Sequence, residues 1–189
     1  MRVHTRPERL AVLTLIVAAS LPGLAACTAE AEADTVTAPA SSPAQVRTAL
    51  VDLYAGERAS GDDADAAECF ADDLLGRVSP EELRDGGVLD ASYRPRGTLA
   101  TLDRPVAEAW TEAQMSCTDF VAESTEAQEA LTKGRLDADA YAACLDGRLD
   151  AETIRDASVS TLMARFDDPA VGEMSVAQSE CSVLSVPRG

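Results

Sequence analysis

The spacing of apolar residues after position 43 constrains the fold of this chain of 189 residues more than any other sequence feature. Apolar side chains recur there at intervals of three and four residues, which is the period of an amphipathic α-helix. They almost nowhere alternate as they would in a β-strand. Proline, glycine and aspartate divide the pattern at positions typical of helix ends. The sequence therefore predicts one compact all-α domain over residues 44–189.

Local signals predict where the helices begin and end. Helices are expected over residues 43–58, 63–77, 80–85, 103–134, 139–148, 151–165 and 169–183. Ser79, followed by Pro80 and Glu82, is a capping box that starts the third of these helices. The expected N-caps of the last three helices are Asp137, Asp150 and Asp168. The helix over 151–165 is expected to turn Ile154, Leu162 and Phe166 toward the core.

Residues 103–134 show the strongest helical period. Their apolar stripe comprises Val106, Trp110, Ala113, Cys117, Phe120, Val121, Ser124, Ala127 and Leu131. The segment forms either one long helix or two helices that join near Ser124. Trp110 lies on the stripe, so we expect its side chain in the core.

Two parts of the chain resemble each other in the same order. Residues 63–85 match residues 137–156, and residues 103–117 match residues 167–181. The first pair shares an aspartate-rich start, a cysteine, a Gly-Arg turn, a capped helix and an Arg-Asp end. The second pair shares its aspartate, proline, apolar positions and final cysteine. We predict an internal duplication, with one repeat over about 44–122 and the other over about 123–189.

The first 26 residues have the three parts of an export signal. Three arginines form the basic start, an apolar stretch runs from Leu10 to about Leu24, and small residues follow. The stretch is near the lower limit of length for a membrane span, and a serine, a proline and a glycine interrupt it. We therefore read residues 1–26 as a targeting segment that is separate from the fold.

Leu24, Ala25, Ala26 and Cys27 match every position of the lipobox of bacterial lipoproteins, and the chain resembles that class over its first 27 residues. The resemblance implies that the Cys27 thiol carries a diacylglycerol and that cleavage follows Ala26. Two acyl chains make the membrane attachment stable, whereas one gives only marginal binding. The alternatives are cleavage at an Ala-x-Ala-like site, which releases a soluble protein, and retention as an uncleaved anchor. In general form the chain is also similar to small actinobacterial lipoproteins, a likeness that implies no activity.

Residues 27–43 comprise the lipidated cysteine and a linker of small residues, prolines and acids, with Val36 as its one sizeable apolar residue. We expect this linker to be a disordered tether with a root-mean-square span of about 20 to 24 Å. The formal net charge of −17 becomes about −19 when residues 1–26, with three arginines and one glutamate, are removed. This charge disfavours binding to nucleic acid or anionic lipid headgroups. Membrane attachment is therefore assigned to the lipid on Cys27.

Four cysteines remain besides Cys27, and an exported chain meets an oxidising compartment in which disulfides form. Four cysteines allow three pairings. If each repeat is a self-contained unit, Cys69 pairs with Cys117 and Cys144 pairs with Cys181, which closes loops of about 48 and 37 residues. No Cys-x-x-Cys motif is present, so a structural role is favoured over a redox role.

The sequence lacks the motifs of the common enzyme and cofactor classes. Its one histidine, His4, leaves with the export signal, so the mature chain cannot build a Ser-His-Asp or Cys-His site. Phosphate-binding loops and Gly-x-Ser-x-Gly are also absent. The aspartate-rich segments at 61–68 and 137–140 do not fit a calcium-binding EF-hand loop. We predict a chain that is not an enzyme and that has no cofactor or metal.

The segment 92–98 is a local basic patch in an acidic chain. Tyr93, Arg94 and Arg96 could contact an acidic partner or a phosphate. The alternative is a surface loop that pairs with acids of its own domain.

Together these features predict a lipid-anchored, disulfide-linked helical domain on the extracytoplasmic face of the cell membrane. The leading hypothesis is an interaction or adaptor module that holds an envelope protein or peptide near the membrane. The alternative is a small-ligand-binding lipoprotein with a pocket between the two repeats. An enzyme, the third hypothesis, would need a water-excluded pair of carboxylates with separated pKa values.

Overall fold

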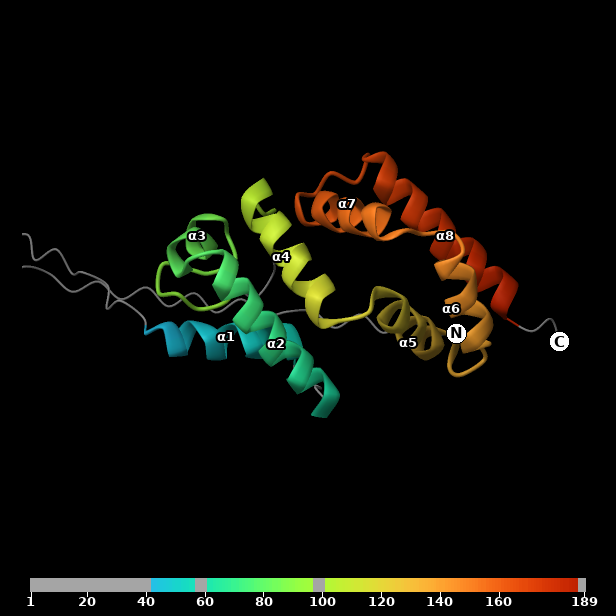
Figure 1. Ribbon diagram of the computed structural model, residues 1–189, viewed down its shortest axis with the longest axis horizontal. Coiled ribbons are helices and arrows are strands. Elements are labelled where there is room, and N and C mark those ends of the chain that lie inside the picture. The colour runs from blue at the N-terminus through green and yellow to red at the C-terminus, as the bar shows by residue number, and fades with distance from the viewer. Residues whose placement is uncertain (1–41, 57–60, 97–100, 187–189) are drawn as a thin grey trace, which may run out of the picture. The chain divides into compact units, whose positions relative to one another are not determined.

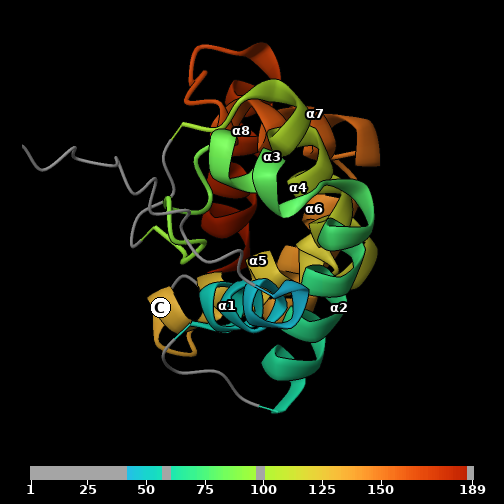
Figure 2. The same ribbon diagram turned by 90° about the vertical axis from the view of Figure 1, so that its left-hand side faces the viewer.

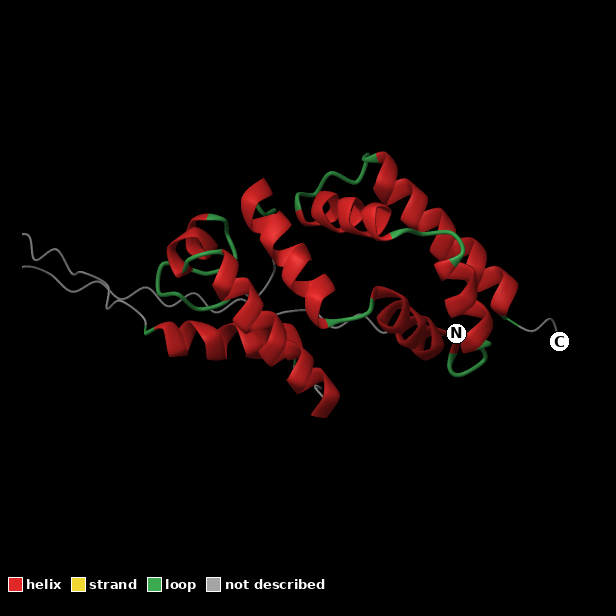
Figure 3. Ribbon diagram, in the orientation of Figure 1, coloured by secondary structure: helices red, strands yellow, loops and turns green. Residues whose placement is uncertain are grey.

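A computed structural model describes residues 42–56, 61–96 and 101–186 (Figure 1). Its helices are α1 (Pro43–Ala55), α2 (Gly61–Arg77), α3 (Pro80–Asp85), α4 (Arg104–Cys117), α5 (Phe120–Thr132), α6 (Ala138–Asp146), α7 (Ala151–Leu162) and α8 (Pro169–Ser185). Besides helices, the described residues contain one isolated bridge between Leu89 and Pro95, so the predicted all-α class is confirmed (Figure 3). The export signal, Cys27 and positions 28–41 of the predicted linker lie outside the described residues.

Capping side chains start the helices. At α3, the amide of Glu82 donates to Ser79 Oγ at 3.2 Å and the amide of Ser79 donates to the Glu82 carboxylate at 2.7 Å, which confirms the capping box. The predicted N-caps Asp137, Asp150 and Asp168 are confirmed at α6, α7 and α8. Further N-caps are Ser42 at α1, Asp103 at α4 and Asp119 at α5.

The segment 103–134 forms two helices, but the predicted position of their junction is wrong. α4 ends at Cys117, and the break lies at Thr118 and Asp119 rather than near Ser124. Thr118 has an extended backbone (φ −139°, ψ 159°), and Asp119 is the N-cap of α5. The disulfide that bonds Cys117 to α2 lies immediately before the break. The apolar period continues across the break and therefore does not reveal the N-cap at Asp119.

One core lies among α1, α2, α3 and α4, with a contribution from Val159 of α7. Its aromatic side chains form a connected group. Tyr54 stacks on Phe70 with ring centroids 4.2 Å apart, and Phe70 meets Trp110 edge to face at 4.7 Å. Trp110 is 5% exposed, which confirms its predicted place in the core. Figures 1 and 2 both show α1 beside α2.

A second core lies among α6, α7, α8 and the residues that flank α6. It comprises Leu136, Tyr141, Leu145, Leu149, Ile154, Ala177 and Cys181. Two predictions of burial are wrong here, because Leu131 is 76% exposed and Phe166 is 68% exposed. α7 ends at Leu162, which leaves Phe166 in the loop before α8. Leu131 lies in the last turn of α5, at the edge of the pocket described below.

Disulfides connect the helices of each half. Cys69 is bonded to Cys117, and Cys144 is bonded to Cys181, so the predicted pairing is confirmed. The first bond joins α2 to α4 and the second joins α6 to α8. Each half therefore contains three consecutive helices whose first and third members are covalently linked. This shared order agrees with the proposed duplication, which stays a prediction.

Candidate functional site

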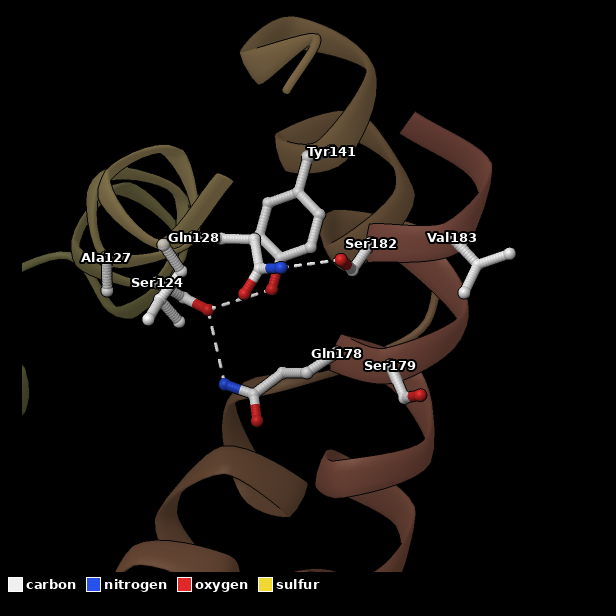
Figure 4. A pocket seen from close by; sticks show the side chains of 9 residues that line it. Ser124, Ala127, Gln128, Tyr141, Gln178, Ser179, Ser182 and Val183 are labelled. Carbon is white, nitrogen blue, oxygen red and sulfur yellow. Dashed lines mark hydrogen bonds between the residues drawn. The ribbon is translucent and has the colours of Figure 1, made fainter. Parts of the chain in front are cut away.

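A pocket of about 500 Å³ lies among α5, α6 and α8 (Figure 4). This volume falls within the range of about 300 to 1,000 Å³ that is usual for ligand sites. The lining residues are Ser124, Ala127, Gln128, Leu131, Tyr141, Gln178, Ser179, Ser182 and Val183. We call this pocket the α5–α8 groove. It lies within residues 123–189, whereas the sequence-based alternative placed a pocket between the two repeats.

Helical periodicity brings the lining side chains to one side of each helix. Positions 124, 127, 128 and 131 recur at intervals of three and four residues on α5, and 178, 179, 182 and 183 share one face of α8. Tyr141 enters from α6 (Figure 4). The Cys144–Cys181 disulfide holds α6 against α8 close to these positions. The amide of Asp137 also donates to the carbonyl of Ser185 at 2.9 Å, which ties the start of α6 to the end of α8.

Uncharged hydrogen bonds connect the walls of the groove. Gln128 Nε2 donates to Ser182 Oγ at 2.5 Å, and Gln178 Nε2 donates to Ser124 Oγ at 3.2 Å. The hydroxyls of Ser124 and Tyr141 lie 3.3 Å apart and share a hydrogen bond. Figure 4 shows both glutamine side chains reaching into the space between α5 and α8. The floor of the groove is therefore a network of amides and hydroxyls.

Among the residues that the structure describes, none of those lining the groove is charged, although the chain has a net charge of −17. The acids of α5 and α8 lie at other positions around their helices, and Glu180 of α8 pairs with Arg148. Leu131 and Val183, which are 76% and 65% exposed, stand at the groove with their apolar side chains open to solvent. The groove therefore combines a polar, uncharged floor with apolar edges.

The predicted contact loop after α3 makes interactions within its own domain. The Tyr93 hydroxyl accepts a hydrogen bond from Arg84 at 3.0 Å, and the Arg84 guanidinium lies 5.4 Å from the centre of the tyrosine ring. Arg94 forms an ion pair with Asp90 at 3.2 Å. Arg96 donates from Nε to a backbone carbonyl of the loop at 3.1 Å. These contacts favour the self-paired surface loop, and contact of this loop with a partner stays a prediction.

A second pocket, of about 310 Å³, is lined by residues of the first predicted repeat, among them Tyr54 and Gln114, and by Glu123 at the start of the second. Desolvation raises the pKa of the Glu123 carboxyl above its usual range, and burial also raises the pKa of Tyr54. Asp119 and Glu126 add to the shift of Glu123 by charge repulsion. Glu123 is exposed to solvent, so it does not supply the water-excluded pair of carboxylates that the enzyme hypothesis requires.

A third pocket, of about 180 Å³, lies between α4 and α7 and contains three arginines. Each guanidinium has a carboxylate partner. Arg104 pairs with Glu108 at 3.2 Å and Arg165 pairs with Asp168 at 3.0 Å. Arg155 bonds to Glu112 of α4, also at 3.2 Å. These pairs neutralise the pocket internally, so its arginines are less available to an external anion.

Sequence reasoning named three of the groove residues as part of an apolar stripe, but it missed the groove itself. A usable signal lies in α8, which has two charged residues, Glu173 and Glu180, among its 17 positions in a chain that is 26% charged. A surface helix normally has a charged outer face. α8 lacks such a charged outer face, which indicates that this face makes contacts. The residues of α5 that lie opposite it are known only from the fold.

Two findings concern membrane spans and metal ligands. Among the residues that it describes, none of the helices has the length and apolarity needed to cross a bilayer. The same residues hold no group of three or more acidic, cysteine or histidine side chains that could bind a metal ion. The lipobox and Cys27 lie outside the described ranges. Comparison of the chain with protein families, curated proteins and solved structures gave no match.

Proposed function

We propose that this protein is an exported, lipid-anchored envelope protein that acts as a non-enzymatic interaction module at the outer face of the cytoplasmic membrane. Two features support the anchor: the export signal over residues 1–26 and the lipobox that ends at Cys27. The α5–α8 groove supports the binding role. It is an open, uncharged surface on a strongly acidic chain, and a disulfide links two of its helices, α6 and α8.

The observation that carries the binding role is the exposure of Leu131 and Val183 beside buried Tyr141. Exposed apolar side chains are common one at a time, but their grouping around a concave, polar floor is typical of a contact surface. A charged surface would have to lose its hydration shell on binding, which is costly. The groove avoids this cost because its lining is neutral.

The alternative function is binding of a small ligand between the two repeats. It has less support, because the pocket of 180 Å³ at α4 and α7 is filled with ion pairs. The pocket of 310 Å³ at Tyr54 and Glu123 is at the lower end of the usual range. The larger space is in the α5–α8 groove, which is open to solvent.

The anchor is tested with a Cys27→Ala variant of the full chain expressed in its bacterial host or a close relative. We expect the unaltered chain in the membrane fraction and the variant outside it, because the thiol that receives the lipid is missing. A Cys27→Ala variant that stays in the membrane fraction would contradict the lipobox interpretation and favour an uncleaved anchor.

The binding role is tested by photo-crosslinking in intact cells. A photoreactive amino acid at position 183 probes the groove, and the same group at position 184 is a matched control, since Val183 and Leu184 are both 65% exposed and only Val183 lines the groove. We expect a discrete crosslinked envelope protein from position 183 that is weak or absent from position 184. Equal products from both positions, or none from either, would refute the groove as an interaction surface.

A further inference from the structure

We propose that the α5–α8 groove binds an uncharged peptide segment in an extended conformation, and that it holds this segment by its backbone. This inference rests on the proposed interaction function and names the chemistry of the partner. It follows from three properties of the groove: its glutamine amides, its exposed apolar edges and its lack of charge.

The glutamine amides match the hydrogen-bonding groups of a peptide backbone. Each glutamine side chain has one carbonyl oxygen and two N–H groups. One N–H of Gln128 is used by Ser182 and one N–H of Gln178 by Ser124, so both side chains are held in place. Within the described part of the chain, no other residue hydrogen-bonds the remaining N–H or the oxygen of either amide. A peptide unit also presents one N–H and one C=O, and it can pair with both groups of such an amide.

The apolar edges fit the side chains of an extended peptide. Successive side chains of such a segment point to opposite sides of its backbone. Leu131 belongs to α5 and Val183 belongs to α8, so the groove has one exposed apolar residue on each wall. A backbone on the polar floor would therefore place alternate apolar side chains against the two walls, where each contact removes apolar surface from water.

The charge and shape of the lining favour a peptide over other ligands. A cationic ligand would lack a carboxylate in the groove, and an anionic ligand would lack an arginine or lysine while meeting the repulsion of an acidic chain. A neutral sugar normally needs an aromatic face to cover its C–H groups. Tyr141, the aromatic residue of the lining, is 1% exposed and offers only its hydroxyl. A neutral peptide satisfies both the floor and the edges.

The test measures binding of the purified full chain in detergent to a defined probe by isothermal titration calorimetry. The probe is an acetylated and amidated hexapeptide with two adjacent valines between two pairs of serines. It has no charge, and in an extended conformation its two valines point to opposite walls. A second hexapeptide of the same sequence carries N-methyl groups on alternate backbone amides, which removes donors and leaves the side chains unchanged. Maltose serves as the neutral sugar. We expect binding of the first peptide, a loss of about tenfold or more in affinity on N-methylation, and no binding of maltose.

Variants locate the binding in the groove. Gln178→Met removes the amide with little change in size, and Gln114→Met of α4 is the matched control outside the groove. Val183→Glu adds a charge to one wall, and Leu184→Glu adds the same charge at an equally exposed neighbour. We expect a loss of about five- to tenfold for Gln178→Met and a greater loss for Val183→Glu, with both controls within about twofold of the unaltered chain. Unchanged circular dichroism of the variants confirms that they fold.

The outcomes separate this inference from the proposed function. Equal affinity of the two peptides, binding of maltose alone, or equal effects of the groove variants and their controls would each overturn backbone recognition in the groove. Absence of any binding would do the same. If the crosslink from position 183 persisted in cells, the interaction function would stand without this partner chemistry. A crosslink from position 183 that joins two copies of the chain would overturn the inference in favour of self-association.

Discussion

A methyl group at Gly86 should destabilise the first core, and the reason is geometric. Gly86 follows α3 and has an ordinary helical backbone conformation (φ −76°, ψ 0°), so alanine would meet no backbone strain there. A Cβ at this position would lie 2.6 Å from Val106 Cγ2 and 3.0 Å from the carbonyl oxygen of Glu82. Carbon atoms in favourable contact are about 3.5 to 4.0 Å apart. The new methyl group therefore overlaps α4 by about 1 Å.

Val106 has little freedom to relieve this overlap. It is 2% exposed, and a valine in a helix strongly prefers one rotamer. The structure must therefore shift α3 relative to α4, and overpacking of this kind costs about 1 to 3 kcal/mol. In a domain of this size, each kcal/mol lowers the melting temperature by about 2 to 4 °C. Gly86→Ala should thus lower it by about 2 to 12 °C.

Gly76→Ala is the matched control, and it should change the stability in the opposite direction. Gly76 lies in α2, and a Cβ there would have no atom within 4 Å. Alanine is favoured over glycine in a helix by up to about 1 kcal/mol, so this variant should be as stable as the unaltered chain or more stable. The assay is chemical and thermal unfolding of both variants, followed by circular dichroism. A Gly86→Ala variant no less stable than Gly76→Ala would refute the packing of α3 against α4 described here.

Three further predictions concern the second disulfide, the pH dependence of stability and the N-cap of α8. Replacing both cysteines of the Cys144–Cys181 bond by alanine should lower the free energy of unfolding by about 4 kcal/mol, from the chain-entropy relation for a loop of 37 residues. Urea unfolding measures this loss, and a value below about 1 kcal/mol would show that the bond does not stabilise the second half. The pKa of Glu123 is raised in the folded state, so its charged form opposes folding once the pH rises past the usual pKa range of glutamate. Glu123→Gln should therefore raise the melting temperature at pH 7 and leave it unchanged at pH 4. Glu129→Gln, further along the same helix and also exposed, is the control, and equal shifts in both variants would contradict the partial desolvation of Glu123. Asp168→Ala should lower the free energy of unfolding in urea by about 1 to 2 kcal/mol, because the N-cap of α8 and the hydrogen bond from the buried Ser160 hydroxyl of α7 are both lost. An unchanged free energy would show that these two hydrogen bonds do not contribute.

The sequence predicted those parts of the structure that depend on neighbouring residues. Asp150 starts α7 because its carboxylate accepts the amide of Thr153 at 2.8 Å, a contact between positions three apart. The disulfide pairing was also predictable, since the internal similarity placed two cysteines in each half. The end of α4 was not predicted, because the apolar period continues from Cys117 through Phe120 and hides the N-cap at Asp119.

The groove could not be predicted from the sequence, because it depends on contacts between residues that lie far apart along the chain. Gln128 and Ser182 are 54 positions apart, as are Ser124 and Gln178. The packing of α5 and α8 against α6 brings them together. Leu131 was placed in the core because it continues the apolar period of α5. Periodicity gives the face of a helix on which a residue lies, but it does not tell how far the neighbouring helices extend along that face.

The position of the acids explains why binding is expected at the groove rather than elsewhere. Five aspartates cap helices, where the backbone amides at the helix start stabilise their charge. Others pair with arginines, as Asp72 does with Arg47. Each of these carboxylates is hydrated on its outer side, and contact there would remove water from a charge. The α5–α8 groove has no such charge, so a neutral partner can displace water from it at lower cost, while the net charge of the chain repels anionic polymers. The acidity that makes most of the chain a poor contact surface therefore directs a neutral partner to the groove.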